Sequence, residues 1–418
     1  MNAEVKPGYK LTEVGVIPED WDVKPLATVV NYTNGKAHEQ SITDSGRFVV
    51  VNSKFISSEG FTRKYCEECF CPTAKGDVLM VMSDVPNGRA IAKCFWVDSD
   101  STYTVNQRIC VLNPKEIDGE FLFYKLDRNP FYLTFDDGAK QTNLRREDVL
   151  SCPLALPNSE TEQRAIAEAL SNADALIESL EQLIAKKRQI KQGAMQELLT
   201  GKKRLPGFSG EWAVKRLGDL FSFSGGYSAS RDQLSSEGHC YLHYGDIHGS
   251  SKMIIDAKED YQNIPKLNIP LKRIVSNSLL EDGDVVFVDA SEDDEGTSKY
   301  IVVVNKDDIP FIAGLHTIVA KSKTSELTHE YPRYCFQTAS VHQQFLFFAV
   351  GTKVSGISKS NIPKLTLPVP PYPEQAAIAE ILMDMDSEID VLEVKLEKAR
   401  QLKQGMMHNL LTGKIRLL

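Results

Sequence analysis

The 418-residue sequence lacks several features that would place it in particular classes of protein. No apolar run approaches the ~20 residues that span a bilayer. The start, MNAEVKPGYK, has no apolar stretch behind a basic one and does not resemble a secretory signal. The eight cysteines are irregularly spaced, which favours a reducing compartment over a disulfide framework. We therefore expect a cytoplasmic protein without a membrane segment.

Patterns for catalysis and metal binding are also scarce. The sequence has no G-x-x-x-x-G-K-[ST] loop, which argues against nucleotide hydrolysis. Cys66, Cys69 and Cys71, with Cys94 later, lack the paired C-x-x-C spacing of a zinc site, so we expect thiols and no bound metal. The tetrapeptide NPFY at 129–132 is similar to the N-P-P-[YF] tetrad of amino-group methyltransferases. It follows a helical stretch and no glycine-rich cofactor motif accompanies it, so we interpret it as a helix end.

The net charge of −9 counts against a protein whose whole surface binds nucleic acid. It leaves open a DNA site built from local basic loops or completed by a partner. The acidic run at 292–295, EDDE, suggests a solvated loop. Its alternatives are a carboxylate that accepts from a cytosine amino group and a site of metal-dependent cleavage.

What the sequence does contain is a duplication. Residues 162–205 align with 374–417 without a gap, and 25 of the 44 positions are identical. Apolar residues recur in 4-3 steps, the heptad signature of helices that pack along a seam. They are Ile166, Leu170, Ala173, Ile177, Leu180 and Ile184, repeated as Ile378, Leu382, Met385, Ile389, Leu392 and Leu396.

Each copy predicts a helix of nearly forty residues. Gly201 and Gly413 provide the stops, and Gly193 and Gly405 predict a bend or a close backbone contact. A helix with one apolar stripe is unstable alone in water, so we expect the two copies to bury each other.

Polar positions are retained between the copies as well. This predicts either a surface that each copy presents to the same kind of partner subunit, or a duplication too recent to have drifted. The partner-binding candidates are Lys186, Arg188, Lys191 and Gln192, repeated as Lys398, Arg400, Lys403 and Gln404.

The segments between the helices repeat more faintly. Trp21-Asp-Val-Lys matches Trp212-Ala-Val-Lys, Gly76-Asp-Val matches Gly283-Asp-Val, and Gly138-Ala-Lys140 matches Gly351-Thr-Lys353. The runs FVVV, DVLMVM, RICVL, DVVFV and YIVVV predict β-strands. Two related, strand-rich domains that bind different ligands would diverge in this way, although loops also drift without selection.

The ends of the chain extend the repeat. LTEVGVIPEDW at 11–21 corresponds to RLPGFSGEW at 204–212, and the sequence stops at Arg416-Leu-Leu, where that linker would begin. We therefore expect a pseudo-twofold, circular organisation with neighbouring termini and antiparallel helices.

Over essentially its whole length the chain resembles the DNA-specificity subunit of type I restriction–modification systems. The resemblance rests on EQRAIAEAL/EQAAIAEIL, KQGAMQELLTGK/KQGMMHNLLTGK, the W-x-V-K starts and the loops GAKQTNL and GTKVSGI. It implies an α+β fold with target-recognition domain 1 (residues 1–157), a first helical spacer (158–201), target-recognition domain 2 with its linker (202–370) and a second spacer (371–418).

The resemblance also implies a function. Each recognition domain would read one half of a split DNA target, and the paired helices would set the gap and dock two modification subunits. Those partners would methylate adenine with S-adenosylmethionine, and a restriction subunit with ATP and Mg²⁺ could join. The chain itself would be non-catalytic, without a cofactor of its own. The alternatives are a coiled-coil scaffold that binds only proteins and a stand-alone enzyme.

Loops with cationic and amide side chains are the candidates for DNA contact, since Lys and Arg suit phosphates while Gln and Asn can bridge adenine. In the first domain they are Arg89, Gln107, Arg108, Lys140, Gln141, Thr142, Asn143, Arg145 and Arg146. In the second they are Tyr227, Ser230, Arg231, His316, Lys353, Ser355, Ser358 and Lys359.

Overall fold

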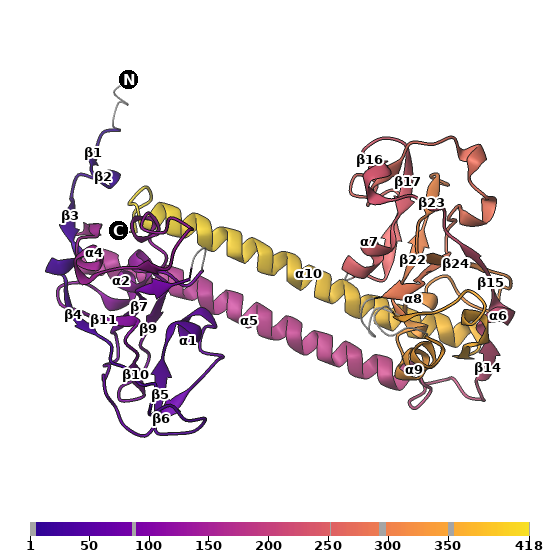
Figure 1. Ribbon diagram of the computed structural model, residues 1–418, viewed down its shortest axis with the longest axis horizontal. Helices are drawn as coiled ribbons and strands as arrows, with labels where there is room; N and C mark the ends of the chain where they lie inside the picture. The colour runs from indigo at the N-terminus through magenta and orange to yellow at the C-terminus, as the bar shows by residue number, and fades with distance from the viewer. Residues whose placement is uncertain (1–5, 86–88, 251, 292–297, 350–354, 418) are drawn as a thin grey trace. The chain divides into compact units, whose positions relative to one another are not determined.

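A computed structural model describes residues 6–85, 89–250, 252–291, 298–349 and 355–417 of the chain (Figure 1). The chain divides into two compact units. Unit 1 comprises Met1–Glu181 and Val394–Leu418, and unit 2 comprises Gln182–Glu393. Each unit holds one strand-rich domain and part of both long helices. In the described ranges, no helix is long and apolar enough to cross a membrane.

The domain of unit 1 is built from short strands and helices. Its strands are β1 (Tyr9–Thr12), β2 (Gly15–Pro18), β3 (Trp21–Pro25), β4 (Val30–Asn34), β5 (Phe48–Val51), β6 (Tyr65–Cys66), β7 (Val78–Val81), β8 (Ser83–Asp84), β9 (Cys94–Trp96), β10 (Tyr103–Val105), β11 (Ile109–Pro114), β12 (Thr142–Asn143) and β13 (Pro153–Pro157). Its helices are α1 (Ser53–Ser57), α2 (Gly119–Leu126), α3 (Pro130–Leu133) and α4 (Arg146–Leu150).

The domain of unit 2 has the same kind of composition. Its strands are β14 (Ala213–Arg216), β15 (Phe221–Gly225), β16 (Leu234–Ser235), β17 (His239–Leu242), β18 (Ile254–Asp256), β19 (Lys266–Leu267), β20 (Val285–Val288), β21 (Ala290–Ser291), β22 (Tyr300–Val304), β23 (Phe311–Ala313), β24 (Thr317–Ser322), β25 (Ser355–Gly356) and β26 (Thr366–Val369). Its helices are α6 (Leu217–Leu220), α7 (Tyr244–Gly249), α8 (Pro332–Cys335) and α9 (Ala339–Phe348).

The two domains share a core topology, to which unit 2 adds one edge strand in each sheet, β18 and β16. The central sheet has the order β4-β11-β7-β9 in unit 1 and β15-β24-β20-β22-β18 in unit 2. A second sheet runs β10-β5-β6 and β23-β17-β19-β16, with its first pair parallel in both units. All five strands predicted from apolar runs are present, and the expected α+β class is confirmed.

Alternating side chains divide each central sheet between two cores. In unit 1, Val78 and Met80 face the core that includes the long helices, whereas Leu79 and Val81 face a second core. In unit 2, Val285 and Phe287 face the core that includes the long helices, whereas Val286 and Val288 face a second core.

The long helices α5 (Glu160–Leu198) and α10 (Tyr372–Leu410) have 39 residues each, as predicted. All twelve heptad positions are buried or half-buried. Gly201 and Gly413 end the helices with φ of +69° and +70°, the left-handed conformation that glycine adopts at little cost. The expected close contact at Gly193 and Gly405 is wrong, because α5 and α10 run through these residues and an added Cβ would meet open space.

Chain segments from both ends of the sequence meet in unit 1. The hydroxyl of Tyr9 donates to the carbonyl of Gly413 at 3.2 Å, and a Cβ built on Gly413 would lie 2.5 Å from Pro18. The expectation of neighbouring termini is thus confirmed for the described residues.

Candidate nucleic-acid interface

In unit 1, one end of the central sheet gathers three segments that carry candidate residues. The N–H of Met82, after β7, donates to the carbonyl of Arg108 at 2.9 Å, and the N–H of Leu144, after β12, donates to the carbonyl of Met82 at 2.8 Å. β12 also pairs with β8. The loop before β11, the β7–β8 connection and the glycine-led loop therefore lie side by side.

The same hydrogen bonds recur in unit 2. The N–H of Asp289, after β20, donates to the carbonyl of His316 at 3.1 Å, and the N–H of Ile357 donates to the carbonyl of Asp289 at 2.9 Å. β25 pairs with β21, as β12 pairs with β8. His316 therefore stands at the position that Arg108 has in unit 1.

A fourth segment joins each group through a glycine. A Cβ on Gly35 would lie 2.0 Å from the carbonyl oxygen of Asn106, and one on Gly226 would lie 1.9 Å from that of Gly314, so only glycine fits. The next residues, Lys36 and Tyr227, are equivalent, because their N–H groups donate to Val105 and Ala313 at 2.8 and 2.7 Å. We call residues 35–36, 82–85, 89–90, 106–108 and 140–146 edge 1, and residues 226–231, 289, 314–317 and 355–359 edge 2.

Lys36, which is exposed on edge 1, is not among the residues predicted from the sequence. A signal for it existed, since Gly35 follows Trp21 by 14 positions and Gly226 follows Trp212 by the same number. The neighbouring letters, TNGK and SGGY, differ too much to show the match without that count.

Amide side chains on edge 1 are held in place. Gln141 Nε2 donates to Ser83 Oγ at 2.7 Å, and Ser83 Oγ donates to Asn143 Oδ1 at 2.7 Å. Both amides are exposed, whereas Thr142 between them is buried and donates to Asp136 at 2.9 Å. The geometry thus presents Gln141 and Asn143 outward as a pair and makes Thr142 a structural residue.

Edge 1 also concentrates positive charge in a net-acidic protein. The guanidinium of Arg146 lies 5.3 Å from the centre of the Tyr32 ring, and Gln107 donates to the Glu39 carboxylate. The side chains of Arg146 and Gln107 are nevertheless exposed to solvent. The exposed cations are Arg89, Arg108, Lys140, Arg145 and Arg146, together with Lys36.

On edge 2 the central candidate is His316. Its Nδ1 lies 3.1 Å from Asp289 Oδ1, and its ring packs edge-on against Tyr244 with centroids 5.3 Å apart. The residue is exposed, and its φ of +56° is uncommon for a residue other than glycine. Such strain is typical of functional sites, and the two contacts fix the imidazole while its Nε2 is not engaged by them.

The other candidates of edge 2 are partly occupied by contacts within the domain. Tyr227 is half-buried, Ser230 caps a short 3-10 turn through Gln233, and Arg231 donates to Asp246 at 2.9 Å. Arg231 keeps 58% of its side chain exposed, so it remains available to a phosphate.

The remaining candidates lie near or within segments that are outside the described residues. Lys353 and the acidic run 292–295 lie outside the described residues, and for Ser355 only the backbone, in β25, is described. Ser358 and Lys359 are exposed.

The retained polar side chains of the long helices form contacts within the chain. In unit 1, Lys403 Nζ lies 2.5 Å from Asp174 Oδ1, and the Tyr124 hydroxyl donates to Asp174 Oδ2 at 2.8 Å. We call this group pin 1. Pin 2, in unit 2, repeats it with the ion pair of Lys191 and Asp386 and a 2.6 Å hydrogen bond from the hydroxyl of Tyr334 to Asp386.

A second pair of contacts is also duplicated. Arg400 Nη2 lies 2.6 Å from Glu181 Oε1 in unit 1, and Arg188 Nη2 lies 2.6 Å from Glu393 Oε1 in unit 2. Together with the pins, these pairs show that α5 and α10 run antiparallel in each unit. Four of the partner-binding candidates thus have an intrachain reason for their retention. The other four are exposed, and for them partner binding stays a prediction: Lys186, Gln192, Lys398 and Gln404.

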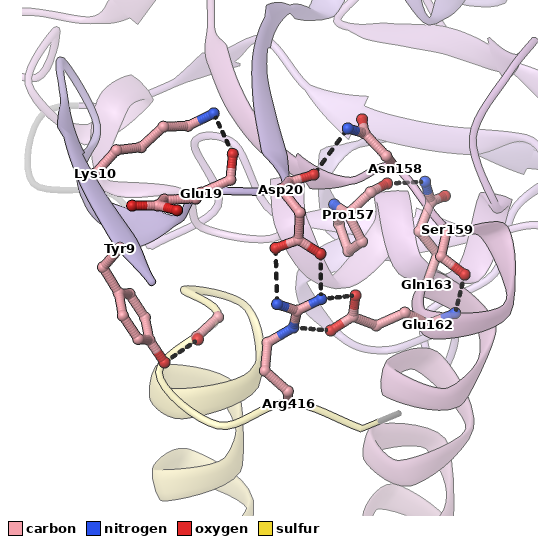
Figure 2. A network of polar contacts seen from close by, with 11 residues as sticks. Tyr9, Lys10, Glu19, Asp20, Pro157, Asn158, Ser159, Glu162, Gln163 and Arg416 are labelled. Carbon is pink, nitrogen blue, oxygen red and sulfur yellow. Dashed lines mark hydrogen bonds and ion pairs between the residues drawn. The ribbon is translucent and has the colours of Figure 1, made fainter. Parts of the chain in front are cut away.

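A third duplicated contact joins each helix end to its domain. In clamp 1, shown in Figure 2, Arg416 donates to both oxygens of Asp20 at 2.8 Å and to those of the buried Glu162 at 2.5 and 2.7 Å. The bidentate hydrogen bonds from Arg416 hold the pKa of the Asp20 carboxyl below its usual range. In clamp 2, Arg204 donates to both oxygens of the buried Glu374 at 2.6 Å.

The motifs set aside from sequence have structural roles. Asn129 caps α3 by accepting from the N–H of Phe131 at 2.9 Å, so NPFY lies at a helix end, which is the N-terminal end of the short helix that follows α2. Burial raises the pKa of the thiols of Cys66, Cys71 and Cys94. Across the part of the chain that the structure describes, no three metal-ligating side chains cluster.

Comparisons with known proteins agree with these observations. A family model described as the type I restriction modification DNA specificity domain matches residues 18–190 and 209–401. The type I restriction enzyme MjaVIII specificity subunit of Methanocaldococcus jannaschii is 22% identical over 96% of this chain and 94% of its own. The crystal structure of a type I restriction–modification S subunit from M. genitalium superposes with a TM-score of 0.60 at 16% identity, over 97% of this chain and 98% of that one. A chain from a structural study of complex assembly and conformational transition of the type I R-M system gives 0.54 at 16% identity, over 96% and 99%.

Proposed function

The chain belongs to the type I restriction–modification DNA specificity family and is a DNA-recognition subunit, and we propose that each of its domains reads one half of a split DNA target. Edge 1 would read the first half and edge 2 the second. Arg108 has the donors to contact a guanine in the major groove, and Gln141 with Asn143 suits an adenine. His316 would take the corresponding place in the second half-site.

The observation that supports this proposal is that edge 1 and edge 2 have the same backbone hydrogen bonds but different side chains at equivalent positions. The backbone contacts of Arg108 and His316 match, as do those of Lys36 and Tyr227. A framework that keeps its hydrogen bonds and changes the side chains at these positions fits two readers of different DNA sequences.

The long helices would act as the spacer between the readers. Linking two readers raises affinity, and their specificities multiply because both half-sites must be present. The exposed Lys186, Gln192, Lys398 and Gln404 would contribute to the docking of two modification subunits. Adenine methylation with S-adenosylmethionine would take place on those subunits, and ATP and Mg²⁺ would belong to a restriction subunit. The whole assembly would act on DNA in the cytoplasm.

The test is a map of adenine methylation across the host genome, with and without this gene. We expect a split motif that disappears with the gene. If the modification subunit is expressed and no motif changes, the proposal is wrong, and a scaffold that binds only proteins becomes the better account.

A further inference from the structure

In each unit, three elements meet at a single carboxylate. Asp174 comes from α5, Lys403 from α10 and Tyr124 from α2 of the recognition domain. In unit 2 the roles of the long helices are exchanged, because Asp386 lies on α10 and Lys191 on α5, while Tyr334 comes from α8. Each pin therefore ties one recognition domain to both helices at once.

The pins are more shielded than ordinary surface ion pairs. The side chains of Lys403 and Lys191 are 25% and 20% exposed, and those of Asp174 and Asp386 are 40% and 39% exposed. Each ammonium also lies near the ring of its tyrosine, at 5.7 Å from Tyr124 and 5.5 Å from Tyr334. Partial burial and the cation–π contact strengthen such a pair beyond the small contribution of an exposed one.

The apolar seam cannot by itself fix where a domain sits along the helices. Heptad positions repeat every seven residues, and apolar contacts are not directional, so neighbouring arrangements differ little in energy. A charged group at a seam acts differently, because a shift would leave it partly buried without a partner. Polar residues at such places are known to specify register.

Each pin also has a fixed relation to its clamp. Lys403 precedes Arg416 by 13 residues, and Lys191 precedes Arg204 by 13. Each domain is therefore held to its helices at two places, the clamp at the helix end and the pin further along. Two attachment points prevent a rotation that one point would allow.

We infer that pins 1 and 2 hold each recognition domain in one orientation on the helix pair and thereby determine the gap length accepted between the half-sites. The inference rests on the proposed function. Each base pair adds ~3.4 Å of rise and about a tenth of a turn to the distance between half-sites. A domain that can change its orientation on the helices could still bind a half-site displaced by one base pair, whereas a domain held in one orientation could not.

The experiment uses the full chain with its modification subunits and begins from the methylation motif mapped for the wild type. Plasmids then carry that motif with the mapped gap and with gaps one base pair shorter or longer. The variant Lys191→Met with Lys403→Met keeps the apolar stems and removes the charges. We expect its preference for the mapped gap to fall about tenfold, the ratio expected for loss of a hydrogen bond to a charged group, while the half-site sequences stay the same.

Two further variants give the result its meaning. Lys191→Arg with Lys403→Arg keeps the charge and should restore most of the preference. Lys395→Met removes the same group from an exposed position of α10 and should leave the preference at the wild-type value. If the double methionine variant does not fold, Tyr124→Phe with Tyr334→Phe, which removes only two hydroxyls, should lower the preference in the same direction.

The outcomes separate the two proposals. A wild-type gap preference in both the methionine and the phenylalanine variants overturns the pins as determinants of the gap but leaves the two-domain reading intact. A change in the half-site sequences would also overturn it, because the pins would then act on reading itself. If the wild-type protein methylates no split motif, the proposed function fails and this inference fails with it.

Discussion

Clamp 1 and clamp 2 share the pair of an arginine with a buried glutamate, but the chain around this pair is connected differently in the two units. In unit 2, Arg204 and Trp212 belong to one continuous linker, and Trp212 Nε1 also donates to Glu374 at 3.0 Å. In unit 1, Arg416 comes from the last described residues and reaches Asp20, 396 positions away in sequence. The arginine–glutamate pair thus forms both where the chain is continuous and where it is not.

A second contrast separates the framework from the edges. Pins, clamps and sheet hydrogen bonds recur in both units, whereas the edge residues at equivalent places are Lys36 and Arg108 in unit 1 and Tyr227 and His316 in unit 2. Under the proposed function, the framework would position the readers and the edge residues would determine what is read.

The largest effect should come from breaking a clamp. Arg416→Met leaves the buried Glu162 without its cation, which should lower the free energy of unfolding of unit 1 by about 3 kcal/mol or more. Arg204→Met should destabilise unit 2 to a comparable extent if chain continuity is unimportant. Denaturant unfolding followed by hydrogen exchange in each unit measures both.

The matched control is Arg416→Met with Glu162→Gln, which also removes the buried charge and should recover part of the loss. If Arg416→Met had no effect while Arg204→Met unfolded unit 2, the two joints would not be equivalent.

The next effect concerns reading. Arg108→Ala should relax discrimination at one position of the first half-site by about 1–3 kcal/mol, because a base contact is lost. His316→Ala should do the same in the second half-site only. Binding of duplexes with single base changes, with the modification subunits present, checks both. Relaxation of the wrong half by either variant would contradict the assignment of the edges.

A smaller effect is expected from the residue that sequence analysis missed. Lys36→Ala should weaken binding to all sequences alike and reduce the salt dependence of binding by about one phosphate contact. Tyr227→Ala at the equivalent place carries no charge change, so its salt dependence should match the wild type. Binding titrations at several salt concentrations distinguish the two. An unchanged slope for Lys36→Ala would remove it from the DNA interface.

An effect of pH on stability distinguishes the residues that follow the pin tyrosines. In unit 1, Lys125 donates to the carbonyl of Leu411 at 2.7 Å, and burial lowers its pKa to about 8. An unfolded lysine has a pKa of about 10.4, so the unfolded state binds more protons between these values and the contribution of Lys125 to stability rises with pH across this window. The variant Lys125→Met should lack this rise.

In unit 2 the equivalent residue is Cys335, and burial raises the pKa of its thiol well above the usual value. Its contribution to stability should therefore fall as pH rises above about 8.5, the opposite sign. The measurement is the difference in unfolding free energy between wild type and each variant, Lys125→Met or Cys335→Ala, over this pH range. Equal pH dependence of the two differences would refute the comparison.

Much of the framework was predictable from sequence because it is periodic. Heptads gave the two helices, glycines gave their ends, and β-branched runs gave strands such as Val285–Val288. The predicted close contact at Gly193 and Gly405 is wrong because a helical glycine can also face open space, where nothing selects for a side chain.

The contacts of the retained polar residues were not predictable, because they join segments at unequal spacing. Tyr124 precedes Asp174 by 50 positions, whereas Tyr334 precedes Asp386 by 52, so a gapless alignment cannot reveal the match. The candidate residues of the two edges were predicted from their residue types in loops. Which residues gather there depends on backbone pairing such as that of β12 with β8, which the sequence does not encode locally.

The central claim is that each domain reads its own half of the target. Its most direct test replaces residues 212–369 with the second domain of another family member and maps the methylated motif in cells. We predict that the second half-site changes while the first half-site and the gap are retained. A change in both half-sites would contradict the claim.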